Sequence, residues 1–254
     1  MTEYTHDRIV PFKDSGLSKK QQIASMFDRI AFRYDFLNRF LSGGIDVYWR
    51  KKAIRELARP GEGVQPLSIL DVATGTGDMA IMMTKYLSPQ KVTGIDISEG
   101  MLEIGRQKVA RLKLEGQILL LSGDSEAIGF PDSHFDAVTV AFGVRNFEDL
   151  EKGLQEMLRV LKPGGRLAVL EFSHPKTAGI RQLYNFYLRL VAPGIGKMLS
   201  SSREAYQYLN DSVKAFPEGQ NFVNILNKNG FHKTRLKRLS LGICTIYIGE
   251  KALA

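Results

Sequence analysis

The sequence predicts an α/β fold with a seven-stranded, mostly parallel sheet that ends in an antiparallel hairpin. From residue 67 onward, short apolar runs alternate with stretches of helical periodicity. This alternation is typical of a parallel sheet with helices on both faces. The last two apolar runs, at 232–239 and 242–248, are joined by a short link. We therefore expect those two strands to pair antiparallel at the end of a Rossmann-like sheet.

The part of the chain before the sheet is predicted to be a tail followed by two helices. Apolar residues at helical spacing predict one helix over 18–41 and another over 45–58, each ended by glycine or proline. Residues 1–16 are expected to form a mobile tail. We expect a tail and helical cap over residues 1–60, and a ligand-binding domain over residues 61–254.

Strands and helices are expected to alternate after that cap. The strands are predicted at 67–72, 92–95, 118–121, 135–141 and 167–172. The helices between them are predicted at 79–87, 100–112 and 150–161, and one more at 221–228 precedes the hairpin. An insertion near 175–215 follows the fifth strand and is expected to act as a lid.

The composition is that of an ordinary globular protein. The 254 residues are 44% hydrophobic, and 35 Lys and Arg against 27 Asp and Glu give 35 − 27 = +8. A basic balance favours nucleic acid, anionic lipid or acidic small molecules as neighbours without choosing among them.

Cys244 is the single cysteine, which suits a small apolar strand residue in a reducing cytoplasm. No apolar run approaches the roughly 20 residues that cross a bilayer. We expect a cytoplasmic protein that meets lipid only at the membrane surface.

A turn containing two glycines follows the first predicted strand. The strand runs into Ala73-Thr74-Gly75-Thr76-Gly77, and a helix begins near Asp78. Glycines at such a turn let a ligand approach the backbone closely, and ligands of open α/β sheets bind beyond the carboxyl ends of the strands. We therefore expect Gly75 and Thr76 to contact a nucleotide-like ligand.

Carboxylates at the ends of the next two strands support this interpretation. Asp96 ends the second strand, about 20 residues beyond the glycines, where a carboxylate can accept hydrogen bonds from both ribose hydroxyls. Asp124 ends the third strand, where it can bind an adenine amino group while Ser125 offers its backbone amide.

The ligand could be a nicotinamide dinucleotide or S-adenosylmethionine. The spacing Gly75-x-Gly77-x-x-Ala80 also fits a dinucleotide fingerprint. However, Asp71 and Asp78 flank the turn and would repel a pyrophosphate, and no second mononucleotide-binding half follows the fourth strand. S-adenosylmethionine carries a sulfonium cation and no phosphate, so acidic flanks suit it. The sequence therefore predicts this methyl donor, and Asp71 either binds its amino group or orients the turn.

Two longer stretches resemble a specific family. Residues 34–42 (YDFLNRFLS), continuing to Trp49-Arg50, and residues 159–173 (RVLKPGGRLAVLEFS) resemble the two signatures of the ubiquinone/menaquinone biosynthesis C-methyltransferases. Residues 130–132 and 142–146 match as well, and the resemblance extends from about residue 20 to 250. It departs at Ala141, where the family usually has a serine, and at Asp46, where it usually has a histidine.

The resemblance implies a class I methyltransferase that methylates a ring carbon of a demethylated polyprenyl quinol, with demethylmenaquinol to menaquinol as the leading reaction. A methoxy-benzoquinol of the ubiquinone pathway is the alternative within the family. By position, Thr76, Asp96, Asp124 and Ser125 match the family's contacts to S-adenosylmethionine. The partners expected are a polyprenyl quinol and the membrane surface, and no nucleic acid.

Arg145 is the predicted catalytic residue. Methylation of a quinol carbon needs an electron-rich ring, which a phenolate provides, and ionising a phenol of pKa about 10 at pH 7 costs roughly 4 kcal/mol. Arg145 follows the fourth strand, where the transferred methyl group is expected, and it remains protonated in proteins. The resemblance implies a water held by this arginine as the base, so we expect Arg145 to stabilise the phenolate and position that water. The alternative is a surface arginine that pairs with Glu148 or Asp149.

Several other assignments stay open. His174, after the fifth strand, is a second possible base or an ordinary loop residue. Phe27, Tyr34 and Phe142 either shield the sulfonium or belong to the core. No clustered ligands suggest a metal site.

The apolar insertion 184–196 and the amino-terminal helices either cover a channel for the prenyl tail or simply pack on the sheet. Five basic residues either favour anionic lipid or protect a strand edge: Lys228, Lys233, Arg235, Lys237 and Arg238.

Three other functions are considered beside the quinol methyltransferase. One is a methyltransferase acting on another small molecule or lipid. The charge of +8 also raises an RNA methyltransferase, but the sequence has no cysteine near the fourth strand, no Asn-Pro-Pro-Tyr motif and no basic-aromatic module. A non-catalytic dinucleotide-binding protein is disfavoured by the acidic turn.

Overall fold

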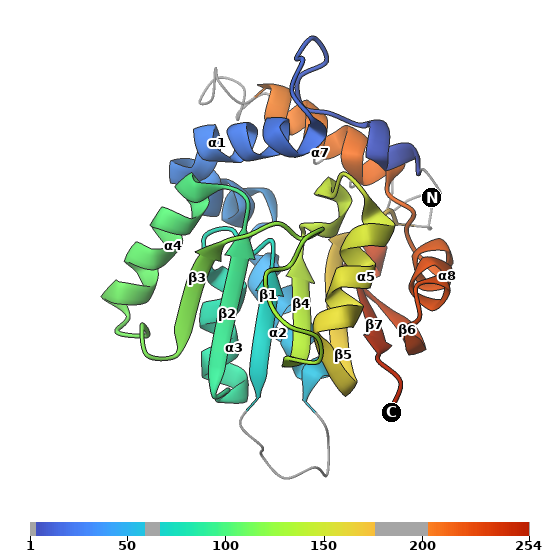
Figure 1. The fold of residues 1–254 in the computed structure, drawn as a ribbon. Helices are drawn as coiled ribbons and strands as arrows, with labels where there is room; N and C mark the ends of the chain where they lie inside the picture. The colour runs from blue at the N-terminus through green and yellow to red at the C-terminus, as the bar shows by residue number, and fades with distance from the viewer. Residues whose placement is uncertain (1–3, 59–66, 176–202, 254) are drawn as a thin grey trace.

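A seven-stranded sheet forms the centre of the structure (Figure 1). The computed structural model describes residues 4–58, 67–175 and 203–253. The strands lie in the order β3-β2-β1-β4-β5-β7-β6. Neighbours from β3 to β5 pair in parallel, and β7 pairs antiparallel with both β5 and β6. The strands are β1 (Ser68–Val72), β2 (Lys91–Asp96), β3 (Ile118–Ser122), β4 (Phe135–Ala141), β5 (Leu161–Phe172), β6 (His232–Leu239) and β7 (Cys244–Glu250). This confirms the predicted fold class.

Helices cover both faces of the sheet, and α1 (Lys19–Leu41) and α7 (Arg203–Ala215) lie across its carboxyl edge (Figure 1). The helices are α1 (Lys19–Leu41), α2 (Ile45–Leu57), α3 (Asp78–Leu87), α4 (Glu99–Arg111), α5 (Leu150–Val160), α7 (Arg203–Ala215) and α8 (Gln220–Lys228). Buried residues of α2, α3 and α4 pack in one apolar cluster and those of α5 and α8 in another. Among the described helices, none has the length and apolar character that crossing a membrane requires.

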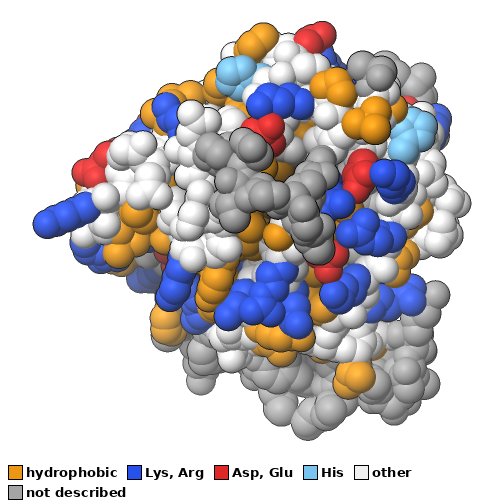
Figure 2. Space-filling view, turned by 90° about the horizontal axis from the view of Figure 1, so that it is seen from below, with side chains coloured by type: hydrophobic (Ala, Val, Ile, Leu, Met, Phe, Trp, Pro, Cys, Tyr) orange, Lys and Arg blue, Asp and Glu red, His pale blue; other side chains and the backbone are white. Residues whose placement is uncertain are grey.

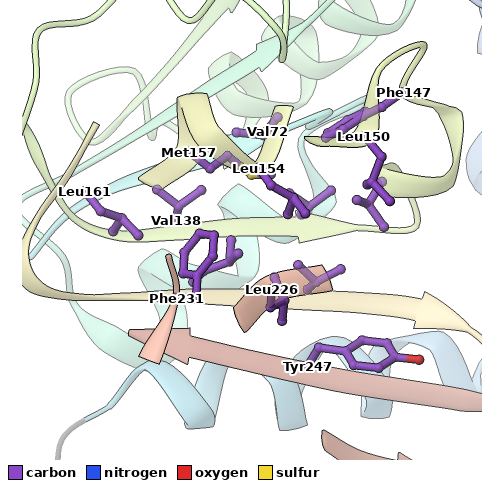
Figure 3. Close-up of a cluster of buried hydrophobic side chains, with 14 of the residues drawn as sticks. Val72, Val138, Phe147, Leu150, Leu154, Met157, Leu161, Leu226, Phe231 and Tyr247 are labelled. Carbon is purple, nitrogen blue, oxygen red and sulfur yellow. The ribbon is translucent and has the colours of Figure 1, made fainter. Parts of the chain in front are cut away.

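The larger cluster shows why the sequence forms these layers. Leu150, Leu154 and Met157 recur at helical spacing along α5 and are fully buried. The Asp149 carboxylate caps the helix by accepting from the Lys152 amide at 3.0 Å. Figure 3 shows these side chains directed at the sheet, together with Val138 of β4. The apolar stripe of α5 therefore fixes how the segment after β4 meets the sheet.

Two expectations need correction. The residues expected to be a mobile tail include a short 3-10 helix, Thr5–Arg8, whose His6 side chain is completely buried. The Tyr4 hydroxyl donates to the Glu151 carboxylate at 2.6 Å, so this part of the tail is packed on α5. The fifth strand begins at Leu161 and not at 167, because the Lys-Pro-Gly-Gly segment is itself extended and Leu161 pairs with Phe135.

A buried tyrosine allows a test of the packing between α8 and β7. The Tyr247 hydroxyl, fully buried, accepts a hydrogen bond from the Gly219 amide at 2.7 Å. Tyr247→Phe leaves that amide without a partner, which is expected to lower the free energy of unfolding by about 1–3 kcal/mol. Urea unfolding measures the change, and Tyr48→Phe, at a side chain 47% exposed, is the control. Equal stability of the two variants would contradict the prediction.

Candidate functional site

The main cavity lies at the carboxyl ends of the parallel strands, beneath α1. It contains about 650 Å³ of empty space, including its opening to solvent. Its walls come from the segments after β1, β2, β3 and β4 and from one side of α1. The lining includes Ala73, Gly75, Asp96, Ile97, Gly123, Asp124, Ser125, Ala141, Phe142, Gly143 and Asn146 from the sheet side, and Lys20, Ile23, Phe27 and Tyr34 from α1.

A second, smaller cavity adjoins the first. The two share Tyr34, Ala73, Gly75 and Ala141 in their walls. The smaller one is also lined by Asp71 and Thr76. The structure therefore brings together all six residues predicted to bind the cofactor: Asp71, Gly75, Thr76, Asp96, Asp124 and Ser125.

The turn after β1 is held by a buried carboxylate. Ala73, Gly75 and Gly77 all have positive φ, of 53°, 56° and 76°, which two glycines make accessible at little cost. The Asp71 carboxylate accepts hydrogen bonds from the hydroxyls of Thr74 and Thr139, both at 2.6 Å. Of the two roles predicted for Asp71, the contacts of this structure correspond to orienting the turn.

The ionisation of Asp71 should be measurable as a pH dependence of stability. Burial raises the pKa of Asp71 to about 6 from 3.8, so the folded state holds this proton more tightly than the unfolded state. The contribution of Asp71 to stability is therefore fully present below pH 3.8 and is lost as pH rises through about 6. The loss corresponds to roughly 3 kcal/mol.

Asp71→Asn cannot ionise, so its stability relative to wild type is expected to rise between about pH 4 and pH 6 and to be level above that range. Unfolding free energies of the two proteins, measured at intervals across this range, give the difference directly. A difference independent of pH would contradict the assignment.

Asp96 and Asp124 stand at the ends of β2 and β3, as predicted. Asp96 accepts from the Gly75 amide at 2.8 Å and from the Ser98 amide at 2.9 Å, and burial raises its pKa. The Asp124 carboxylate is 31% exposed and accepts from the Lys20 ammonium group at 2.6 Å. Asp124 also accepts from the Glu126 amide at 2.9 Å. Backbone groups therefore fix both carboxylates, and Asp124 is in addition paired with a lysine of α1.

Polar side chains anchor α1 over the cavity, and the sequence did not reveal them. Asp28 accepts from the Ser98 hydroxyl at 2.6 Å and from the Gly100 amide at 2.9 Å at the start of α4. Asp35 accepts from the Thr76 hydroxyl at 2.6 Å and from Lys108 at 2.8 Å. α1, which forms the roof of the site, thus contacts the glycine-containing turn after β1 directly.

Arg145 is buried beside the main cavity, and not at the surface. It lies in a short 3-10 helix, Val144–Asn146, after β4 and is 5% exposed. Its Nη1 donates to the Glu171 carboxylate at 3.0 Å and also to the Phe142 carbonyl. The alternative pairing with Glu148 or Asp149 is not observed. Phe142, Gly143 and Asn146 line the cavity, whereas Arg145 itself is not among its lining residues.

Two further charged residues near the site were not assigned a role from sequence. Glu171 of β5 is fully buried against Arg145. Arg50 of α2 is 6% exposed, lines the smaller cavity and lies over the Phe142 ring at 5.4 Å. Both stand in the family signatures, and a charged residue within an otherwise apolar strand or helix face is itself a signal of a buried, paired group.

The two departures from the family pattern have different surroundings. Asp46 is buried and contacts Arg50, Arg39 and the Ser42 hydroxyl, so it joins an arginine of α1 to one of α2. Ala141 lines both cavities but has no side-chain polar group.

The remaining candidates are also located. The ring of Phe27 meets Tyr34 edge to face at 5.8 Å, and both line the main cavity with Phe142. His174 is not among the lining residues, and its Nδ1 lies 3.2 Å from a Glu218 carboxylate oxygen. The insertion 184–196, expected to cover a channel, lies outside the described residues.

Of the five basic residues near the carboxyl end of the chain, Lys228 of α8 pairs with Glu151, and three more form ion pairs beside the sheet. Lys233 pairs with Glu250, and Arg235 and Lys237 pair with Glu56. All three belong to β6, the edge strand. Figure 2 shows Lys and Arg side chains gathered on the face at the amino ends of the parallel strands, opposite the cavity. These contacts favour the protected strand edge over a lipid site.

Comparison with known proteins identifies the family. The model of the ubiE/COQ5 methyltransferase family matches residues 16–251. A demethylmenaquinone methyltransferase of Bacteroides fragilis is 46% identical over 98% of this chain and 99% of its own. The ubiquinone/menaquinone biosynthesis C-methyltransferase UbiE of Geobacter sulfurreducens is 47% identical over 92% of this chain and 90% of its own.

Solved structures share the fold. Phosphoethanolamine N-methyltransferase 2 of Haemonchus contortus, in complex with S-adenosyl-L-methionine, superposes with a TM-score of 0.65 at 14% identity, over 95% of this chain and 61% of its own. An S-adenosylmethionine-dependent methyltransferase of Aquifex aeolicus gives 0.56 at 20% identity, over 81% of this chain and 91% of its own. With a family model spanning nearly the whole sequence and relatives of this similarity, the chain belongs to the ubiE/COQ5 methyltransferase family.

Proposed function

We propose that this protein transfers the methyl group of S-adenosylmethionine to a ring carbon of a demethylated polyprenyl quinol, converting demethylmenaquinol to menaquinol. The assignment of the substrate rests on the match along nearly the whole chain to relatives named for demethylmenaquinone, from Bacteroides fragilis and Porphyromonas gingivalis. Other relatives carry a name that covers both quinones, so the ubiquinone-pathway substrate is the alternative.

The cavity supports a binding mode for the cofactor. Asp96 faces the cavity with a carboxylate that can accept from the ribose hydroxyls beside its two backbone contacts, because an ionised carboxylate has about four acceptor positions. Asp124 and Ser125 would hold the adenine, and Gly75 and Thr76 the chain between ribose and methionine. When bound, the cofactor supplies an electrophilic methyl group on a cationic sulfur, which the faces of Phe27, Tyr34 and Phe142 would attract.

Arg145 is assigned to the acceptor oxygen. The Arg145 guanidinium would stabilise the phenolate and position a water beside it, lowering the cost of ionisation. The electron pair of the phenolate ring forms the new carbon–carbon bond as the carbon–sulfur bond breaks, and the ring proton leaves to water. His174, paired with Glu218 away from the lining residues, has less support as the base.

The amino-terminal residues are proposed to act as a cap. Residues 1–60 contribute α1, which crosses the carboxyl edge and contacts the turn and α4 (Figure 1). Together with the insertion near 175–215, this cap would enclose the prenyl tail above the methyltransferase domain of residues 61–254.

Access to a lipid substrate supports contact with the membrane surface. Phe32 of α1 is 91% exposed, and Phe36 one turn later and Tyr48 at the start of α2 are also exposed. Exposed aromatic side chains on one pair of helices suit insertion among lipid headgroups. We propose that the protein works from the cytoplasm at the inner face of the cell membrane, which sedimentation of the full chain with anionic and neutral vesicles tests.

Methyl transfer from labelled S-adenosylmethionine to a demethylated quinol tests the reaction itself. Demethylmenaquinol is expected to accept the label at a ring carbon, and a demethylated methoxy-benzoquinol offered in parallel tests the second specificity. Tight cofactor binding without transfer to either quinol would indicate a methyltransferase with another acceptor. Binding of a nicotinamide dinucleotide in its place would overturn the proposal.

A further inference from the structure

Glu171 is a carboxylate enclosed in the sheet beside the predicted catalytic arginine. It lies near the carboxyl end of β5, where Leu170 pairs with Ala141 at the end of β4. Its side chain has no exposed surface. Because β4 leads into the 3-10 helix that carries Arg145, the parallel pairing of these two strands brings the two charges together from positions 26 residues apart.

The contacts hold one end of the Arg145 guanidinium and leave another part of it unused. Nη1 donates to both carboxylate oxygens of Glu171, at 3.0 and 3.3 Å, and to the Phe142 carbonyl. Glu171 is itself fixed by the Phe172 amide, which donates to it at 2.8 Å. The Nε of Arg145 is buried and has no hydrogen-bond partner within the part of the chain that the structure describes. An N–H of a charged group left in this state is expected to have a ligand or an ordered water as its acceptor.

A purely structural ion pair explains these contacts poorly. Burying two charges costs desolvation that their attraction barely recovers, and apolar side chains of similar size usually stabilise a core as well or better. A pair built for stability would also satisfy every donor, whereas this one holds Nη1 firmly and leaves Nε free. The arrangement is typical of a group kept in one orientation for a ligand.

We propose that Glu171 is the positioning residue of the site, holding Arg145 directly behind the residues that line the cavity, so that its charge, and its Nε–H through a water, act on the acceptor oxygen. This inference rests on the proposed function, since it assigns Arg145 to the quinol. Glu171 acts through Arg145 and does not touch the substrate.

Titratable groups of three other elements interact with this pair: Tyr34 of α1, Tyr208 of α7, and Cys244 and Tyr247 of β7. Tyr208 of α7 is buried, donates to the Asn146 side-chain oxygen at 3.1 Å, and has its pKa raised by burial, with Arg145 and Glu171 acting on it in opposite directions. Cys244 of β7 is buried next to Glu171, which helps to raise its pKa. Burial raises the pKa of Glu171 itself, and Arg145 opposes that rise.

Two variants of the full chain distinguish the effect of the position of the Glu171 carboxylate from the effect of its charge. Glu171→Asp keeps the charge but is one methylene too short to hold Nη1, so kcat is expected to fall by about 10- to 100-fold with little change in KM for the quinol. Glu171→Gln keeps the shape and one acceptor oxygen but no longer balances the positive charge of Arg145. That charge then lowers the pKa of the quinol hydroxyl further, so the acidic limb of the pH profile of kcat is expected to move to lower pH by about one unit.

The Arg145→Ala background tests whether Glu171 acts through the arginine. There, Glu171→Gln is expected to cause no further loss of kcat, because the group it positions is absent. Cofactor affinity measured by calorimetry, expected within about threefold of wild type for every variant, shows that each protein is folded.

The outcomes of these experiments are distinguishable. If wild type is active and Arg145→Ala is not, but both Glu171 variants keep the wild-type kcat and pH profile, the positioning role is wrong and the proposed function stands. An additive loss in the double variant would also overturn it. If Arg145→Ala keeps full turnover, the assignment of Arg145 to the acceptor oxygen is wrong, and Glu171 has no catalytic group to position.

Discussion

Replacing Arg145 by alanine is expected to lower the rate of methyl transfer at pH 7 by about 100-fold or more, because a buried cation beside a developing oxyanion is worth that much in comparable sites. Without it, the phenol keeps its ordinary pKa of about 10, and its ionisation costs roughly 4 kcal/mol at pH 7. The affinity for S-adenosylmethionine is expected to stay within about threefold of wild type, since the Arg145 side chain bonds Glu171 and the Phe142 carbonyl and none of the six predicted cofactor contacts.

The pH dependence of the rate of Arg145→Ala tests whether the lost group stabilises a phenolate. If the lost group stabilises a phenolate, the rate of Arg145→Ala should rise about tenfold per pH unit from pH 7 to pH 9, as free phenol ionises. Initial rates with labelled cofactor measure both effects. Arg106→Ala, which removes an α4 guanidinium paired with Glu99 at the surface, is the matched control. Full turnover by Arg145→Ala at pH 7 would exclude it from the chemistry.

The buried Glu171 carboxylate also affects the stability of Arg145→Ala. Arg145→Ala leaves a buried carboxylate without its partner, and such a group becomes neutral by taking up a proton when its pKa is already raised by burial. The variant is therefore expected to be less stable at alkaline pH than at neutral pH, so its thermal melting is measured at each pH at which a rate is reported.

The parts of the site predicted from sequence are those fixed by strand ends. Each parallel strand places the residue after it at one edge of the sheet, so Asp96 and Asp124 follow from the position of β2 and β3 alone. The acidic flanks Asp71 and Asp78 then distinguish a cationic ligand from a pyrophosphate. These inferences need no knowledge of which strands are neighbours.

Contacts that depend on pairing across the fold could not be predicted in the same way. Glu171 meets Arg145 only because β4 and β5 are adjacent and in register. Likewise, Asp28 and Asp35 contact the site because α1 crosses the carboxyl edge, and an isolated helix does not reveal which of its polar residues face inward.

Two packed segments escaped prediction because the residues near them in sequence give no apolar pattern. In α7 the buried face consists of Tyr208 and the completely buried Ser212, so a polar residue interrupts the apolar periodicity. His6 is buried against the Phe216 ring at 5.7 Å, although its neighbours in sequence are polar. Burial in both cases is decided by distant partners.

Replacing Asp96 by asparagine is expected to weaken S-adenosylmethionine binding by about 100-fold, because two hydrogen bonds from ribose to a charged acceptor contribute about 1.5–3 kcal/mol each and asparagine retains one oxygen. Calorimetric titration measures the loss. The control is Asp136→Asn, because Asp136 also accepts from a backbone amide, that of Ser68 at 2.8 Å, and pairs with Lys162. Asp136 is not among the residues that line either cavity.

Asp96 also accepts from the Gly75 amide, so a weaker turn could mimic the loss of a ribose contact. An analogue of the cofactor lacking both ribose hydroxyls separates the two causes. If Asp96 binds the ribose, removing the hydroxyls costs wild type about as much as the substitution does and costs Asp96→Asn little, which is the signature of two coupled changes. If the analogue loses the same affinity in both proteins, Asp96 supports the turn, and the ribose must be held by another group.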